Sequence, residues 1–295
     1  MMSLVDCRRF YAEEIELAAG LSSSELVEAF AHVPREDFLG PGPWQVATAS
    51  RGGLSAGGKI HLSYRTVHHP QQTYHNVLIA LDAKSDINNG QPGSLASWID
   101  ALDLKAGDQA YHLGCGTGYY TAVLATVVGP QGTVMASEVH PDLAARARRN
   151  LSGYANVTVH AGDGSTFDPE ECDAILINAG VGQPNPLWLD RLREGGRLVL
   201  PLTVSTGPTV GQGFMVKIVR AQSRFSAQVI SPVAIFSCTG LRDAQSDESL
   251  RKAFTTGAFL KLHSVRRDSH EECDTCLLHR SGLCLSLTDA DQTTR

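Results

Sequence analysis

Residues 109–202 alternate short apolar runs with amphipathic runs, and no other feature of the chain constrains its fold as strongly. The apolar runs have the length of buried strands, and the runs between them have the length of helices. Such alternation predicts a parallel sheet with helices on both faces. The first expected strand ends in a glycine-rich turn, HLGCGTGYY at 112–120, which opens a helix. We therefore expect an α/β fold with a doubly wound, mostly parallel sheet.

The sequence on either side of this segment predicts further elements. Two successive strands, at 213–221 and 225–236, lie so close in sequence that we expect an antiparallel hairpin at the edge of the sheet. Together with the preceding strands they make a seven-stranded sheet. Helices are expected at 7–19, 22–32, 72–85, 94–103 and 247–262.

We expect three parts along the chain. Residues 1–104 form an N-terminal helical cover that ends in a loop rich in turn signals, INNGQPGS at 87–94. Residues 105–240 form the sheet-based core. Residues 241–295 form a C-terminal extension, whose last thirty residues show no clear periodicity.

Charge and composition exclude several classes of protein. The chain of 295 residues has a net charge of −6 and no long basic run, so a general duplex-binding surface is not supported. No apolar run reaches the roughly eighteen residues that span a bilayer, and the N-terminus lacks an apolar signal core. Seven cysteines, an odd number, favour reduced thiols. We expect a cytoplasmic protein without nucleic-acid or membrane partners.

The glycine turn has the chemistry of a ligand-binding loop. Glycines let the backbone approach a ligand, and the helix that follows offers free N–H groups. Glu138 ends the second expected strand and Asp163 follows the third, at the sheet edge where open α/β folds form their ligand crevice. The Glu138 carboxylate suits a ribose diol. Two simpler interpretations remain, an Asx turn at Asp163 and a plain strand-to-helix turn at the glycines.

Several stretches carry a more specific resemblance. They are VPREDF at 33–38, HLGCGTGYYTAVLA at 112–125, VMASEV at 134–139, GDGS at 162–165, CDAILINAG at 172–180 and LREGGRLVLPL at 192–202. In these stretches the chain resembles the class I S-adenosylmethionine-dependent methyltransferases and, more narrowly, the protein-L-isoaspartate O-methyltransferase family. The resemblance implies a Rossmann-like methyltransferase fold, S-adenosyl-L-methionine as cofactor, and O-methylation of a carboxylate of a protein or peptide.

The resemblance also implies which residues hold the cofactor. The glycines of the turn would pack against its methionine part, Glu138 would hold the ribose, and Asp163 would face the adenine. The full set comprises His112, Gly114, Cys115, Gly116, Thr117, Gly118, Tyr119, Glu138, Val139, Asp163, Gly164 and Asn178.

The acceptor side departs from the family that the chain resembles. That family carries a signature of the type T/I-S-x-P before the first sheet strand, whereas this chain has Ile-Asn-Asn-Gly-Gln-Pro at 87–92. Amides donate and accept hydrogen bonds, so Asn88, Asn89 and Gln91 are candidates to orient an acceptor. The Asn-Gly pair is equally suited to a simple turn. The departure puts isoaspartyl repair in question, but not methylation itself.

The nature of the acceptor decides whether a base is needed. A carboxylate is already ionised at neutral pH and needs none, whereas a hydroxyl or amine would need one, with His68, His69, His75 and Asp82 as candidates. Three other functions remain open: a small-molecule (natural-product) O- or N-methyltransferase, a non-catalytic S-adenosylmethionine-binding module, and a nicotinamide dehydrogenase. The GxGxG spacing counts against the dehydrogenase, which favours GxGxxG.

A cluster of potential metal ligands lies near the C-terminus, comprising His270, Cys273, Cys276, His279 and Cys284. A CxxC pair with nearby histidines is a spacing that zinc uses. The gap between the ligand pairs is shorter than in a usual zinc finger, and buried thiols also pack as small hydrophobic groups. We therefore assign no metal site from the sequence.

Overall fold

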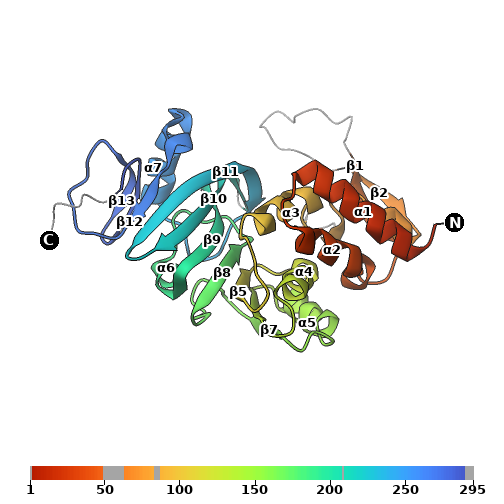
Figure 1. Cartoon of the computed structure of the whole chain (residues 1–295). Helices are drawn as coiled ribbons and strands as arrows, with labels where there is room; N and C mark the ends of the chain where they lie inside the picture. The colour runs from red at the N-terminus through yellow and green to blue at the C-terminus, as the bar shows by residue number, and fades with distance from the viewer. Residues whose placement is uncertain (1, 49–62, 83–86, 208, 290–295) are drawn as a thin grey trace.

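A computed structural model describes residues 2–48, 63–82, 87–207 and 209–289. At its centre lies one sheet with the strand order β13-β14-β12-β11-β10-β9-β8-β5-β6-β7 (Figure 1). Neighbouring strands from β7 to β9 all pair in parallel. The prediction of a mostly parallel central sheet is therefore confirmed. These strands are β5 (Gln109–Leu113), β6 (Thr133–Glu138), β7 (Val157–Ala161), β8 (Cys172–Ile177) and β9 (Leu192–Ser205).

Helices cover both faces of the sheet, as the alternation predicts. Successive strand residues point to opposite faces, so Ala174 and Leu176 of β8 belong to one apolar cluster and Ile175 and Ile177 to the other. The first cluster includes α4 (Tyr119–Val128) and α5 (Pro141–Asn150), and the second includes α6 (Pro186–Arg191) and α7 (Ala244–Thr255). Of the described helices, none is both long enough and apolar enough to cross a membrane.

The expected hairpin is present as β10 (Val210–Ala221) and β11 (Arg224–Phe236), with β10 antiparallel to both β9 and β11. Two reversals of direction make β11 run the same way as β9. Its carboxyl end therefore lies at the same sheet edge as the ends of the parallel strands, and Ser237 forms a parallel bridge to Gly180 just after β8.

The hairpin is not the edge of the sheet, so the expected seven strands are too few. The C-terminal extension adds β12 (Ser264–Arg266), β14 (Leu283–Ser286) and β13 (Cys276–Arg280) beyond β11, which makes ten strands. These strands are three to five residues long. Such short runs are too brief to show a clear alternation.

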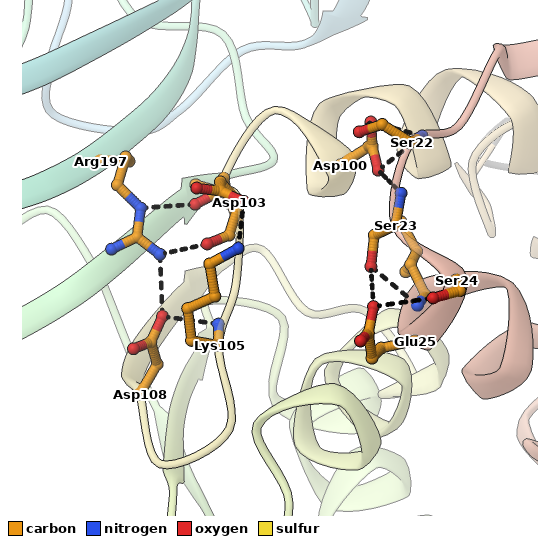
Figure 2. A network of polar contacts seen from close by, with 11 residues as sticks. Ser22, Ser23, Ser24, Glu25, Asp100, Asp103, Lys105, Asp108 and Arg197 are labelled. Atoms are coloured by element: carbon orange, nitrogen blue, oxygen red, sulfur yellow. Dashed lines mark hydrogen bonds and ion pairs between the residues drawn. The ribbon is translucent and has the colours of Figure 1, made fainter.

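The N-terminal helices α1 (Leu4–Ala19), α2 (Ser24–His32) and α3 (Pro92–Asp100) pack against the α4 side of the sheet. Ser23 caps α2 by accepting the N–H of Leu26 at 3.1 Å. Figure 2 shows the Asp100 carboxylate at the end of α3 accepting the backbone N–H groups of Ser22 and Ser23. This carboxylate joins the start of α2 to the end of α3.

A second set of contacts fixes the same segment to the sheet. Arg197 of β9 donates to the carbonyls of Leu102 and Asp103, at 2.6 and 2.7 Å (Figure 2). It also forms a 2.8 Å ion pair with Asp108, and both side chains of this pair are largely buried. The chain that leaves α3 is thereby held against β9.

The prediction of a helix at 72–85 is wrong for residues 72–82, which are the part of this range that the structure describes. Pro70–Thr73 form a short 3-10 turn, and Ala80–Asp82 form β3, which pairs with β4 (Ile87–Asn88). The adjoining chain pairs with β1 (Trp44–Thr48), itself paired with β2 (Ser63–Val67), because Ala47 donates its N–H to the Leu78 carbonyl. Residues 83–86, at the end of the predicted helix, and residues 49–62 lie outside the described chain.

Candidate active site

A cavity of about 760 Å³ opens at the carboxyl ends of the parallel strands. Its size falls in the range of small-molecule sites. One side, which we call the strand-end wall, consists of Leu113, Gly114, Gly116, Ser137, Glu138, Val139, His140, Leu143, Asp163, Gly164, Asn178 and Ala179. The other side, the outer wall, consists of Leu78, Leu81, Ile87, Asn88, Gly90, Gln91, Ser94, Leu95, Trp98, Val210 and residues 232–239.

Glu138 lies at the end of β6 with both carboxylate oxygens held by backbone. Oε2 accepts the N–H of Gly116 at 2.8 Å, and Oε1 accepts the N–H of His140 at 2.9 Å. A carboxylate offers about four lone-pair sites, so two remain for a ligand. The side chain is buried and lines the cavity. This arrangement leaves the carboxylate able to accept from the two hydroxyls of a sugar diol.

Asp163 and Gly164 follow β7 and line the next part of the strand-end wall. Oδ1 of Asp163 accepts the N–H of Ser165 at 2.9 Å, so the Asx turn that the sequence allows is present beside the cavity. Gly164 is packed against the sheet. A Cβ there would lie 2.2 Å from Ser137 Oγ and 2.6 Å from Tyr111 Oη. Only glycine fits at this close approach of the backbone to the sheet.

The start of the glycine turn lies against the end of β8. Gly114 has a φ of +78°, which favours glycine, and a Cβ there would lie 3.0 Å from the Asn178 carbonyl. Asn178 in turn donates from Nδ2 towards the Gly114 carbonyl. Gly114 and Asn178 therefore lie together in the strand-end wall, which Gly116 also lines.

Five other residues predicted to bind the cofactor lie behind the cavity rather than in its lining. The imidazole of His112 is fully buried, bonds through Nδ1 to Thr121 at 2.9 Å, and has its pKa lowered to about 3 by burial. Tyr119 packs edge-on against Phe38 in the aromatic core. The remaining ones, which are also absent from the described lining, are Cys115, Thr117 and Gly118.

The predicted acceptor loop lies on the outer wall, with one exception. Asn88 and Gln91 line the cavity, and Asn88 Oδ1 accepts the N–H of Gly90 at 3.0 Å, which stabilises the turn. Asn89 points away, since its Oδ1 accepts the N–H of Ile79 at 2.8 Å. Its role is therefore to hold β3 to the loop rather than to line the site.

The rest of the outer wall was not predicted. Ser94, Leu95 and Trp98 come from one face of α3, a face that the i, i+4 spacing of the expected helix could have shown. Residues 232–239 reach the cavity because β11 runs parallel to β9, and no local pattern contains that information.

The histidines considered as bases lie elsewhere. His68, His69 and His75 are exposed, and neither they nor Asp82 belong to the described lining of the cavity. Arg35 holds this segment in place. Its fully buried guanidinium donates to the carbonyls of Thr73, His75 and Val77. The sequence did not single out Arg35, although it lies within VPREDF.

Comparisons with known proteins agree with this geometry. The sequence pattern described as Protein-L-isoaspartate(D-aspartate) O-methyltransferase (PCMT) matches residues 61–238. The chain belongs to this family. A protein-L-isoaspartate O-methyltransferase of Ignicoccus hospitalis is 36% identical over 147 residues, which cover 48% of this chain and 68% of that protein. Protein-L-isoaspartate O-methyltransferase 1 of Archaeoglobus fulgidus is 39% identical over 135 residues, 43% of this chain and 62% of that protein.

Solved structures support the fold of this protein-L-isoaspartate O-methyltransferase family member. One protein-L-isoaspartate O-methyltransferase superposes with a TM-score of 0.59 at 21% identity, covering 83% of this chain and 69% of that one. A Plasmodium falciparum structure of the same description, in complex with S-adenosyl-L-homocysteine, superposes with a TM-score of 0.56 at 15% identity, covering 79% and 98%. The Rossmann-like methyltransferase fold is therefore confirmed.

Family membership confirms an S-adenosylmethionine-dependent methyltransferase, and the cavity fits that cofactor. The Glu138 carboxylate keeps lone pairs for its ribose, and Asp163 and Gly164 line the next part of the same wall, where its adenine would lie. The family match ends at residue 238. The extension that adds β12, β13 and β14 therefore lies outside the matched region.

Proposed function

We propose that this enzyme transfers the methyl group of S-adenosylmethionine to a carboxylate of a protein or peptide. One observation carries the proposal. The outer wall of the cavity holds no side chain, among its described residues, that is a base at neutral pH, and the one imidazole of the described lining, that of His140, lies on the strand-end wall beside Glu138. Cys238 is the only ionisable residue described on the outer wall, and burial, chiefly, raises the pKa of that thiol to about 11. An acceptor that must lose a proton would find no base there, whereas a carboxylate needs none.

The bound cofactor supplies a methyl group on a positively charged sulfonium. It would give that methyl group to the acceptor oxygen and keep the carbon–sulfur bonding pair on sulfur, so no proton would have to move. The protein's contribution is alignment and the exclusion of water. Glu138 and Asp163 hold the cofactor, while Leu78, Leu95 and Trp98 provide an apolar outer wall.

The acceptor would be oriented by neutral hydrogen-bond donors of the outer wall. Asn88, Gln91 and Ser94 line the cavity near the glycine turn, and their amide and hydroxyl groups can donate to a carboxylate. Residues 1–104 thus supply these donors, and residues 105–240 bind the cofactor and complete the outer wall with residues 232–239. The relatives' names suggest an isoaspartyl carboxylate as the first acceptor to test.

The test uses purified enzyme and cofactor labelled in the methyl group. Three peptides differ at one position: isoaspartate, aspartate, or the isoaspartate side chain with its free carboxylate converted to an amide. We expect label on the isoaspartyl peptide, release of that label as methanol in mild base, and none on the amide. Base-stable label, or equal labelling of the amide, would contradict a carboxylate acceptor.

The aspartyl peptide tests whether the enzyme is specific for isoaspartate. Equal labelling of the isoaspartyl and aspartyl peptides would support a carboxylate acceptor and contradict specificity for isoaspartate. Cofactor binding without transfer to any peptide would favour a small-molecule acceptor.

A further inference from the structure

The C-terminal hairpin of β13 and β14 gathers three potential metal ligands on one side. In the β13–β14 ladder His279 lies opposite Cys284, and Cys276 lies opposite Ser286. In a regular strand Cys276 and His279, three residues apart, would point to opposite faces. A bulge between Cys276 and Leu278 adds one residue to β13 and restores them to the same face. Cys276, His279 and Cys284 therefore face the same way.

His270 completes the group from the chain that precedes β13. The ligand atoms of His270, Cys276, His279 and Cys284 all lie within 4.8 Å of one another. His270 Nε2 is 3.6 Å from Cys276 Sγ. Zinc bound at about 2.3 Å to sulfur and about 2.1 Å to nitrogen, with tetrahedral angles, places two such atoms about 3.6 Å apart. The observed distance between the His270 nitrogen and the Cys276 sulfur is therefore the distance expected between two ligands of one tetrahedral zinc ion.

The surroundings orient these ligands from outside. The backbone carbonyl of Asp268 lies 3.1 Å from His270 Nδ1, and its carboxylate lies 3.3 Å from the same atom, so Nε2 is the atom that faces the thiols. Arg266, which is largely buried, forms a two-point ion pair with that carboxylate. Histidines that bind a metal through one ring nitrogen typically donate the other ring N–H to a carboxylate or a backbone carbonyl in this way.

Two further groups suit a metal-bound thiolate and imidazole. The N–H of Cys273 donates to Cys276 Sγ at 3.4 Å, a contact that stabilises negative charge on sulfur. His279 Nδ1 is buried with no hydrogen-bond partner, which is rare for a buried polar atom unless a water or an ion satisfies it.

We propose that His270, Cys276, His279 and Cys284 bind one zinc ion in a structural site. Two nitrogens and two sulfurs in a tetrahedral arrangement select zinc, and four protein ligands close the site to substrate. The ion would fasten the outermost strands, β14 and β13, to the chain that leaves β12. The short gap between ligand pairs argued against a usual zinc finger, but here the ligands come from two paired strands and the chain before them rather than from a finger.

The site is remote from the cavity. β12 pairs with Phe225 and Ser226 at the start of β11, whereas the cavity is lined by residues 232–239 at its end. The hairpin lies at the end of the molecule opposite α1 and α2 (Figure 1). Loss of the ion should therefore loosen the extension without removing the ability to bind S-adenosylhomocysteine. A negative result for zinc would leave the proposed methyl transfer untouched, and a negative result for methyl transfer would leave the zinc site untouched.

The experiment measures metal in the full chain, purified without a metal-affinity tag and under reducing conditions. We expect stoichiometric zinc by elemental analysis in the wild type and in Cys273→Ser, which keeps the N–H of residue 273 and loses an exposed thiol that lies beside Cys276 Sγ but outside the four-ligand group. Cys276→Ser and His279→Ala should lose the zinc. Cobalt exchanged into the wild type should give tetrahedral d–d bands and sulfur charge-transfer bands, which Cys276→Ser should weaken or abolish.

Three results would overturn the proposal. The first is the absence of zinc from the reduced wild type together with the absence of a cobalt spectrum. The second is loss of zinc from Cys273→Ser while Cys284→Ser keeps it. The third is a Cys273–Cys276 disulfide in freshly isolated protein that contains no metal. Should a variant fail to fold, the wild type still decides the matter. A chelator should remove its zinc and lower its melting temperature, and added zinc should restore both.

Discussion

The Glu138 carboxylate accepts the backbone N–H of Gly116 at 2.8 Å and thereby joins the end of β6 to the glycine turn after β5. The same carboxylate is our candidate for the ribose of the cofactor. One side chain thus both shapes the turn and faces the ligand. Substitutions at this point should change binding before they change the fold of the sheet.

Glu138→Ala should weaken binding of S-adenosylhomocysteine. Hydrogen bonds to a charged group contribute roughly 1.5–3 kcal/mol, so we expect a Kd roughly 10- to 100-fold higher by calorimetry. Asp142→Asn, which removes an exposed carboxylate on α5, is the matched control and should bind as the wild type does. An unchanged Kd in Glu138→Ala would remove the ribose assignment.

Gly164→Ala should disturb the adenine side of the cavity. The new Cβ would lie 2.2 Å from Ser137 Oγ, and relief of such overpacking typically costs about 1–3 kcal/mol. We expect a smaller thermal shift on adding S-adenosylhomocysteine and a lower melting temperature. Gly153→Ala meets nothing within 4 Å and is the control. Equal behaviour of the two variants would mean that the close approach at Gly164 has no role.

Asn88→Asp tests the charge of the acceptor. The aspartate keeps an oxygen to accept the Gly90 N–H but adds a negative charge to the outer wall. If the acceptor is a carboxylate, like-charge repulsion should raise its KM by roughly tenfold or more. Binding of S-adenosylhomocysteine, which carries no sulfonium charge, should change little. Asn88→Ala should lower turnover without that repulsion, and an unchanged KM in Asn88→Asp would argue for a neutral acceptor.

His112 should make stability depend on pH. Burial lowers its pKa to about 3 in the folded chain, against about 6.5 when unfolded. Between these values the unfolded chain binds a proton that the folded chain does not. The stabilising contribution is therefore complete above about pH 6.5 and falls by about 1.4 kcal/mol per pH unit as the pH drops.

His112→Asn offers a matched variant, since an amide can replace the bond from Nδ1 to Thr121 without titrating in this range. Urea unfolding at several pH values should show a shallower slope for the variant than for the wild type, by about 1.4 kcal/mol per unit. Parallel slopes would show that His112 titrates alike in both states.

The sequence predicted the parallel core well and the flanks poorly, for different reasons. β5 to β9 and their helices have strong periodicity and are bounded by glycines, so their order follows from local pattern. The helix expected at 72–85 failed because its apolar residues suit a strand equally well. Pairing with β1 and the bond from Ala47 to the Leu78 carbonyl decided between the two.

The site shows the same division. Glu138, Asp163, Gly164 and Asn178 could be predicted because the ends of parallel strands must share one edge. His112 and Tyr119 could not be excluded by local pattern, since a residue of β5 and a residue of the first turn of α4 can each point towards the ligand or the core. Their burial is known only once α1, α2 and α4 are packed together.

By itself, the sequence of this chain determined the parallel core, the glycine turn and the acidic residues at the strand ends, because hydrophobic period and turn chemistry act over neighbouring residues. Only the tertiary structure decided the outer wall and the grouping of His270 with the thiols of β13 and β14. Both depend on contacts between residues distant in the sequence. The double reversal that carries the end of β11 to the cavity, and the one-residue bulge that turns Cys276 towards His279, become visible only when the strands are paired.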